Sequence, residues 1–190
     1  MSAVMDKKFE KIFEKEFLPH ADALRTFAYH LTYDDVEADD LVQDTFMKAF
    51  RFIENYETGT NAKAWLFKIL KNGFINEFRR KSKIPQQVDY DEVAKYHDDD
   101  ESANSGYTDL RVEMFHHLMG DEVTNAINDL PVEFRTVILL CDVEEFSYEE
   151  ISKILDIPLG TVRSRLHRAR NLLKEKLKNY AESLGYEDKR

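Results

Sequence analysis

The sequence is poor in the residues on which several classes of protein depend. One cysteine among 190 residues excludes a disulfide framework and a cysteine zinc site. Six glycines and four prolines are few for a protein built on tight β-turns, so the composition favours helices. No apolar run approaches the roughly 20 residues that a membrane span needs, and the charged N-terminus has no signal-peptide cleavage site. We therefore expect a helical, cytoplasmic protein with no membrane insertion.

The sequence also lacks a set of residues typical of catalysis or metal binding. The acidic pair Asp39-Asp40 and the acidic run 98–100 are neighbours along the chain, not the converging carboxylates that hold magnesium. His116 and His117 have no partner at metal-ligand spacing, and Gly59 is not part of a glycine-rich phosphate loop. We therefore expect no enzymatic activity, no metal and no cofactor.

Positive charge is concentrated in two short segments of an otherwise acidic chain. The net charge is −10, yet residues 63–83 carry seven basic side chains against one acidic, and residues 161–178 repeat those numbers. A single segment of this kind is more often a solvated helix face. Two of them, each attached to a motif, favour contacts with nucleic acid. We expect the isolated chain to bind DNA weakly, because its overall field repels phosphate.

Apolar residues recur with helical spacing along almost the whole chain, which predicts an all-α protein. The clearest helix covers residues 38–53, and another covers about 62–80. This periodicity ends at residue 84. We predict two small helical domains, at 1–83 and 119–190, joined by an acidic flexible linker at 84–118.

The C-terminal domain carries a predicted helix-turn-helix. Ser147 and Glu150 form a capping box that opens one helix, and Thr161 is placed to cap a second, basic helix that runs to about Tyr180. The first residues of such a recognition helix reach base edges in the major groove, where arginine can grip guanine. Residues further along contact phosphates. A protein-interaction module with an arginine-coated helix is the alternative.

Three stretches of this sequence resemble the extracytoplasmic-function (ECF) group of the sigma-70 family. They are Asp-Asp-Leu-Val-Gln-Asp-Thr-Phe at 39–46, Trp-Leu-Phe-Lys-Ile-Leu-Lys-Asn at 65–72, and residues 147–170 with Gly-Thr-Val-Arg-Ser-Arg-Leu at 160–166. The resemblance implies a sigma factor that binds core RNA polymerase and directs promoter-specific transcription initiation.

The resemblance also implies a role for each basic segment. The N-terminal domain, similar to sigma region 2, would read the −10 element, where aromatic stacking on an unpaired base and cations for the single strand are needed. Its expected contacts are Tyr56, Asn61, Lys63, Lys68, Asn72, Arg79 and Arg80. The C-terminal domain, similar to sigma region 4, would read the −35 element. Its expected contacts are Arg163, Ser164, His167 and Arg168 near the bases, with Arg165 and Lys174 closer to phosphates.

The implied protein partner is core RNA polymerase. The helix over 41–51 would dock on the β′ clamp helices, and the C-terminal domain would lean on the β flap. The expected clamp contacts are Asp40, Gln43, Asp44, Lys48 and Arg51. An anti-sigma factor is a further partner common in the group, and nothing in the sequence identifies one.

Two other functions stay open at the level of sequence. A stand-alone helix-turn-helix regulator would bind duplex DNA without polymerase, but it would leave the first basic segment without a role. A sigma mimic that sequesters an anti-sigma factor needs no base-reading side chains, which this sequence has. The acidic linker fits a mimic of a nucleic-acid strand and a plain solvated spacer equally well.

Overall fold

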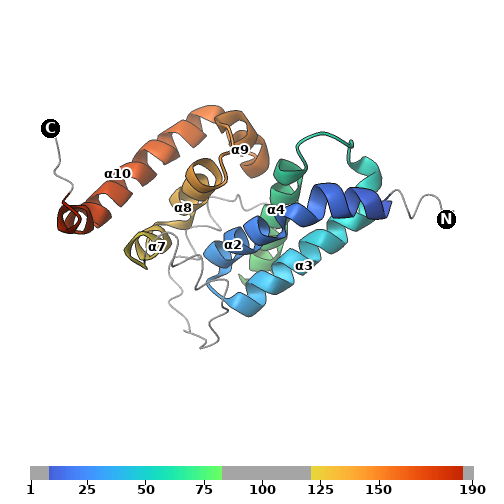
Figure 1. Cartoon of the computed structure of the whole chain (residues 1–190), viewed down its shortest axis with the longest axis horizontal. Helices are drawn as coiled ribbons and strands as arrows, with labels where there is room; N and C mark the ends of the chain where they lie inside the picture. The colour runs from blue at the N-terminus through green and yellow to red at the C-terminus, as the bar shows by residue number, and fades with distance from the viewer. Residues whose placement is uncertain (1–8, 83–120, 186–190) are drawn as a thin grey trace.

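We describe a computed structural model of the chain, covering residues 9–82 and 121–185 (Figure 1). Every regular element in those residues is a helix, which confirms the predicted all-α fold. The helices form an N-terminal group and a C-terminal group that lie against one another. The predicted linker at 84–118 lies outside the described residues.

The N-terminal group consists of three long helices preceded by an irregular entry. The chain passes through a π-helical turn, η1 (Phe13–Phe17), and a 3₁₀ turn, η2 (Leu18–His20). Pro19 lies in η2, so the chain passes from the π-helical turn into α2 through a 3₁₀ turn that contains a proline. The chain then forms α2 (Ala21–Thr32), α3 (Asp35–Arg51), the short η3 (Ile53–Asn55) and α4 (Ala62–Ser82).

Local signals determine where α3 begins. Tyr33 adopts a left-handed conformation with φ of 55°, which ends α2. Asp34 then caps α3, because its side chain accepts a hydrogen bond of 2.8 Å from the backbone N–H of Glu37. The buried stripe of α3 follows the predicted spacing at Ala38, Leu41, Thr45 and Ala49. Phe50 lies near the end of the same helix with half of its side chain exposed.

The apolar surface of α4 is wide because the helix packs on two sides. Leu66, Phe67 and Leu70 are fully buried. On one side α4 lies close to α3 at Gly73, where an added Cβ would come within 3.1 Å of Leu41 Cδ1. On the other side the C-terminal group covers it: the ring of Phe67 meets that of Phe146 edge-on, with centroids 5.2 Å apart.

The C-terminal group holds the helix-turn-helix. It comprises α7 (Asp121–Asn128), α8 (Val132–Ile138), the π-helical η4 (Leu139–Val143), α9 (Tyr148–Leu155) and α10 (Leu159–Ser183). The predicted capping box at the start of α9 is confirmed in both directions. The predicted cap of α10 is wrong: the helix begins at Leu159 after Pro158, and no side chain caps it. A proline at this position fits because it has no N–H that needs a partner.

We expect Ser147→Ala to lower the free energy of unfolding by about 1 kcal/mol. The Ser147 hydroxyl accepts a hydrogen bond of 3.3 Å from the N–H of Glu150, and alanine leaves that N–H without its side-chain acceptor. Urea denaturation measures the change. Ser147→Thr keeps a hydroxyl at the cap and is the control; equal losses in both variants would contradict a capping role.

A second contact between the two groups involves α2 and the turn from α7 to α8. The Tyr33 hydroxyl donates to the backbone carbonyl of Asn128, and His30 Nδ1 lies 2.5 Å from Asn128 Oδ1. Arg135 is buried, lies 4.3 Å from the centroid of the Tyr33 ring, and donates to the Asn128 carbonyl at 2.6 Å. Burial lowers the pKa of Arg135 to about 9. The two groups are therefore joined at two places, around Phe67 and around Asn128.

Candidate nucleic-acid interface

The start of α10 presents a row of polar and basic side chains to solvent. Val162, Leu166 and Ala169 are buried and fix the helix against the C-terminal core. The opposite face carries four of the six side chains predicted to contact the −35 element, and all four are exposed: Arg163, Ser164, His167 and Arg168. Lys174 is exposed further along. This geometry matches a recognition helix, in which the first turns face base edges.

Arg165 departs from the predicted phosphate-contacting position. Its side chain lies on the buried side of α10, with 7% of the residue exposed. The reason is spacing, because position 165 is three residues after Val162 and four before Ala169, on one helix face. That signal was present in the sequence. Arg170 is held by an ion pair with Asp142 at 2.6 Å. This hydrogen bond raises the pKa of Arg170 above its ordinary value.

Tyr56 is buried rather than presented for stacking on a base. Only 7% of the residue is exposed, and its ring lies 5.1 Å from that of Trp65, centroid to centroid. Its hydroxyl donates to Glu16 Oε2 at 2.5 Å. Burial and this hydrogen bond raise the pKa of Tyr56 to about 12. In this conformation Tyr56 anchors the 57–60 turn, and Glu16 also accepts from the N–H of Gly59 at 3.1 Å. No local sequence pattern predicted that Glu16 would accept these two hydrogen bonds.

The basic face of α4 is turned toward the C-terminal group. Lys63 Nζ lies 2.7 Å from Glu144 Oε2 and 5.1 Å from the centroid of the Phe146 ring. The Asn61 side chain donates to Glu150 Oε1. These two residues, predicted to contact the −10 element, therefore face carboxylates of their own chain.

Lys68 and Lys71 share a third carboxylate, that of Asp156. Lys68 Nζ lies 2.8 Å from Oδ1, and Lys71 Nζ lies 3.2 Å from Oδ2. Burial raises the pKa of Asp156, but the hydrogen bonds from the two lysines outweigh it, and the pKa lies below its usual value. Lys71 was not among the predicted contacts, although it lies one helical turn from Lys68.

The remaining predicted −10 residues are not gathered into this cluster. Asn72 is exposed and accepts from Lys71 Nζ at 3.1 Å. Arg80 is exposed near the end of α4 and pairs with Glu77 at 3.2 Å. The side chain of Arg79 lies outside what the structure describes. The structure thus places Asn61, Lys63 and Lys68 against carboxylates of the C-terminal group, whereas Asn72 contacts Lys71 and Arg80 pairs with Glu77 of its own helix.

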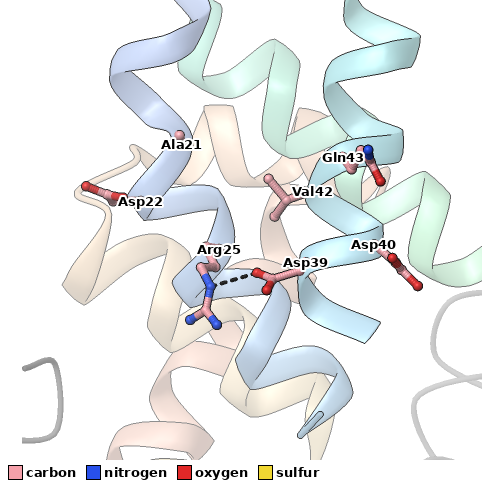
Figure 2. A pocket seen from close by; sticks show the side chains of 7 residues that line it. All are labelled: Ala21, Asp22, Arg25, Asp39, Asp40, Val42 and Gln43. Carbon is pink, nitrogen blue, oxygen red and sulfur yellow. Dashed lines mark hydrogen bonds and ion pairs between the residues drawn. The ribbon is translucent and has the colours of Figure 1, made fainter. Parts of the chain in front are cut away.

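The exposed side of α3 combines charged and apolar side chains. Asp40 and Gln43 line a shallow depression of about 370 Å³ between α2 and α3 (Figure 2). Arg25 lies in it and donates to Asp39 at 2.7 Å. Asp44 and Lys48 pair with each other along the helix, and Arg51 is exposed at its end.

Large apolar side chains lie exposed on this same helix. They include Met47, which is 67% exposed, and Val36 and Phe50. Met47 and Phe50 are three residues apart, so they lie side by side and form an apolar patch next to the charged Lys48 and Arg51. An apolar patch with charged neighbours is typical of a protein–protein interface. The helical pattern alone gave no sign of this patch.

Two further observations concern the described residues. Among them, no group of three or more histidine, cysteine, aspartate or glutamate side chains is arranged to hold a metal ion. In the same part of the chain, no helix has the length and apolar character needed to cross a membrane.

Comparison with known proteins now gives the class of this fold. Residues 17–84 match the family description Sigma-70 region 2, and residues 120–173 match Sigma-70, region 4. The chain is 38% identical to the ECF RNA polymerase sigma factor SigE of Mycolicibacterium smegmatis over 85% of its own length and 60% of that relative. It is 32% identical to EcfG, an ECF RNA polymerase sigma factor of Rhodopseudomonas palustris, covering 91% of this chain and 90% of the relative.

A solved structure agrees with these relatives. The sigma factor RpoE of Bartonella quintana, crystallised with the anti-sigma factor NepR, superposes with a TM-score of 0.64 at 35% identity, covering 88% of this chain and 98% of that one. The two-domain helical architecture and the pair of sigma-70 regions define a sigma-70 protein. The chain belongs to the family of ECF RNA polymerase sigma factors.

Proposed function

We propose that this chain binds core RNA polymerase in the cytoplasm and directs it to promoters by reading a −35 and a −10 element. The observation that carries the proposal is the exposed row Arg163, Ser164, His167 and Arg168 at the start of the second helix of a helix-turn-helix. Arginines at this place are suited to bidentate contacts with guanine. The C-terminal domain, 119–190, therefore has the −35 role.

The N-terminal domain, 1–83, has the −10 role in this proposal. Its cations at Lys63 and Lys68 and the amides of Asn61 and Asn72 suit a single strand, whose affinity comes from phosphate contacts and base stacking. Arg79 and Arg80 would hold phosphates beyond them. Because Asn61, Lys63 and Lys68 face carboxylates of the C-terminal group, this role requires the two groups to separate. The linker at 84–118 is the segment that would allow the separation.

The exposed side of α3 is the proposed contact for the β′ clamp helices of the polymerase. Its support is the combination of an apolar patch with the charged and polar side chains of Asp40, Gln43, Asp44, Lys48 and Arg51. The C-terminal domain would contact the β flap. An anti-sigma factor is a further proposed partner, because the similar RpoE was crystallised with one.

Run-off transcription tests the function. We expect purified core polymerase to give promoter-specific transcripts only when this chain is added, because core supplies the catalysis and the chain supplies promoter reading. The two alternatives give other results. A stand-alone regulator binds duplex DNA tightly without core, and a sigma mimic binds an anti-sigma factor but yields no transcript.

A variant on α3 serves as the control for specific dependence on core. Met47→Asp places a charge in the exposed apolar patch and, because the side chain is two-thirds exposed, leaves the fold intact. We expect it to lose copurification with core and run-off activity together. Core binding and run-off activity that survive the substitution would contradict the proposed role of α3.

A further inference from the structure

Lys68 and Lys71 hold one carboxylate between them. They lie one helical turn apart on α4, and each contacts a different oxygen of Asp156, at 2.8 and 3.2 Å. The side chain of Lys71 is 4% exposed and that of Lys68 43% exposed. Keeping a nearly buried ammonium charged requires an anion beside it. The pair is therefore a built anion site rather than two lysines in water.

The architecture of α9 delivers Asp156 to this site. Asp156 ends α9 in a left-handed conformation, with φ of 56°, at the turn of the helix-turn-helix. Two more carboxylates flank it: Glu150 accepts from Asn61, and Glu144 pairs with Lys63. Three acidic residues on or beside one helix thus cover the polar face of α4. The Phe67–Phe146 ring contact lies at the same interface.

A carboxylate held in this way has the chemistry of a nucleic-acid phosphate. Both groups carry one negative charge and offer two oxygens that accept charge-assisted hydrogen bonds. Lysine binds phosphate as a compact point charge, so an ammonium pair that holds two carboxylate oxygens can hold the two free oxygens of a phosphodiester. The start of α10 takes no part in this contact, and its base-reading row is exposed.

We propose that Lys68 and Lys71 form a binding site for a backbone phosphate of single-stranded DNA, and that Asp156 occupies this site in the free chain. The C-terminal domain then competes with the strand for α4, and the site opens only when the two helical groups separate. That the natural ligand is the promoter strand rests on the proposed function. Lys71 belongs to the basic segment at 63–83 but was not among the expected −10 contacts.

Binding of fluorescein-labelled oligo(dT) to the full chain, measured by anisotropy at low salt, tests the competition. We expect Asp156→Asn to bind about fivefold to tenfold more tightly than the wild type, because the competing charge is lost. Asparagine tolerates the left-handed conformation at this position, so the turn is kept. Glu149→Gln is the matched control, since Glu149 is exposed on the same helix and the change in net charge is equal. It should leave binding nearly unchanged.

A chain that lacks both lysines, here called the lysine background, distinguishes direct competition at the site from a general effect of net charge. In a Lys68→Gln, Lys71→Gln chain we expect weaker binding and no further gain from Asp156→Asn. If circular dichroism shows that the double variant does not fold, Lys68→Gln alone replaces it, because that position is partly exposed. The gain in oligo(dT) affinity from Asp156→Asn should then be reduced. An unchanged affinity of Asp156→Asn, or an equal gain in the lysine background, would overturn the proposal.

Run-off transcription separates this inference from the proposed function. A chain that activates core but shows no effect at Asp156 keeps the sigma function and loses the phosphate site. A chain that shows the oligo(dT) effect but never activates core keeps the phosphate site and loses the promoter strand as its ligand.

Discussion

Replacing Phe67 with alanine is expected to lower the free energy of unfolding by about 3–5 kcal/mol. The Phe67 ring is fully buried between two others, with centroids 5.0 Å from Phe27 and 5.2 Å from Phe146. Phe27 belongs to the N-terminal group and Phe146 to the C-terminal group. Truncation would therefore leave a cavity where the two groups meet, and rigid packing on both sides limits its collapse. Urea denaturation followed by circular dichroism measures the loss.

The same variant should also loosen the coupling between the helical groups. We expect a broader transition, or two transitions, because each group keeps its own core when the shared contact is lost. Phe50→Ala is the control: that side chain is half exposed, and its ring lies 6.3 Å from that of Phe13, centroid to centroid. Its expected loss is below about 1 kcal/mol. Similar losses in the two variants would contradict the buried position of Phe67.

Features that act within one turn of helix could be predicted from the sequence. The capping box of Ser147 and Glu150 and the cap at Asp34 are examples, because donor and acceptor are three residues apart. The buried stripe of α3 follows from helical spacing in the same way. The start of α10 was misplaced because the Thr161 hydroxyl offered one local cap and Pro158 allowed an earlier start.

Contacts between the helical groups could not be predicted, because no local pattern encodes them. Lys68 and Asp156 are 88 residues apart. The charge pattern revealed a basic segment and acidic surroundings, but charge totals do not say which groups pair. The same limit applies to Tyr56. The family resemblance assigned it to DNA, whereas the packing of Glu16 and Trp65 around it, which depends on the tertiary fold, buries it.

Substitutions at the start of α10 are expected to change promoter choice. We expect the double variant Arg163→Ala, Arg168→Ala to lose discrimination of the −35 element and still bind core polymerase. If each arginine grips a guanine, each contributes about 1–3 kcal/mol of discrimination. The folded state should tolerate the change, since both side chains are exposed. The measurement is the ratio of run-off transcripts from a promoter with its −35 element intact and from one with that element replaced.

A ratio of transcripts is the informative quantity because phosphate contacts and base contacts affect it differently. Loss of a phosphate contact weakens binding to both templates alike, whereas loss of a base contact removes the preference itself. Lys153→Ala, Lys178→Ala removes the same charge from exposed positions away from the start of α10, and it should lower both transcripts with the ratio kept. If the arginine variant instead kept the ratio, or lost core binding, the start of α10 would not be the surface that reads the −35 element.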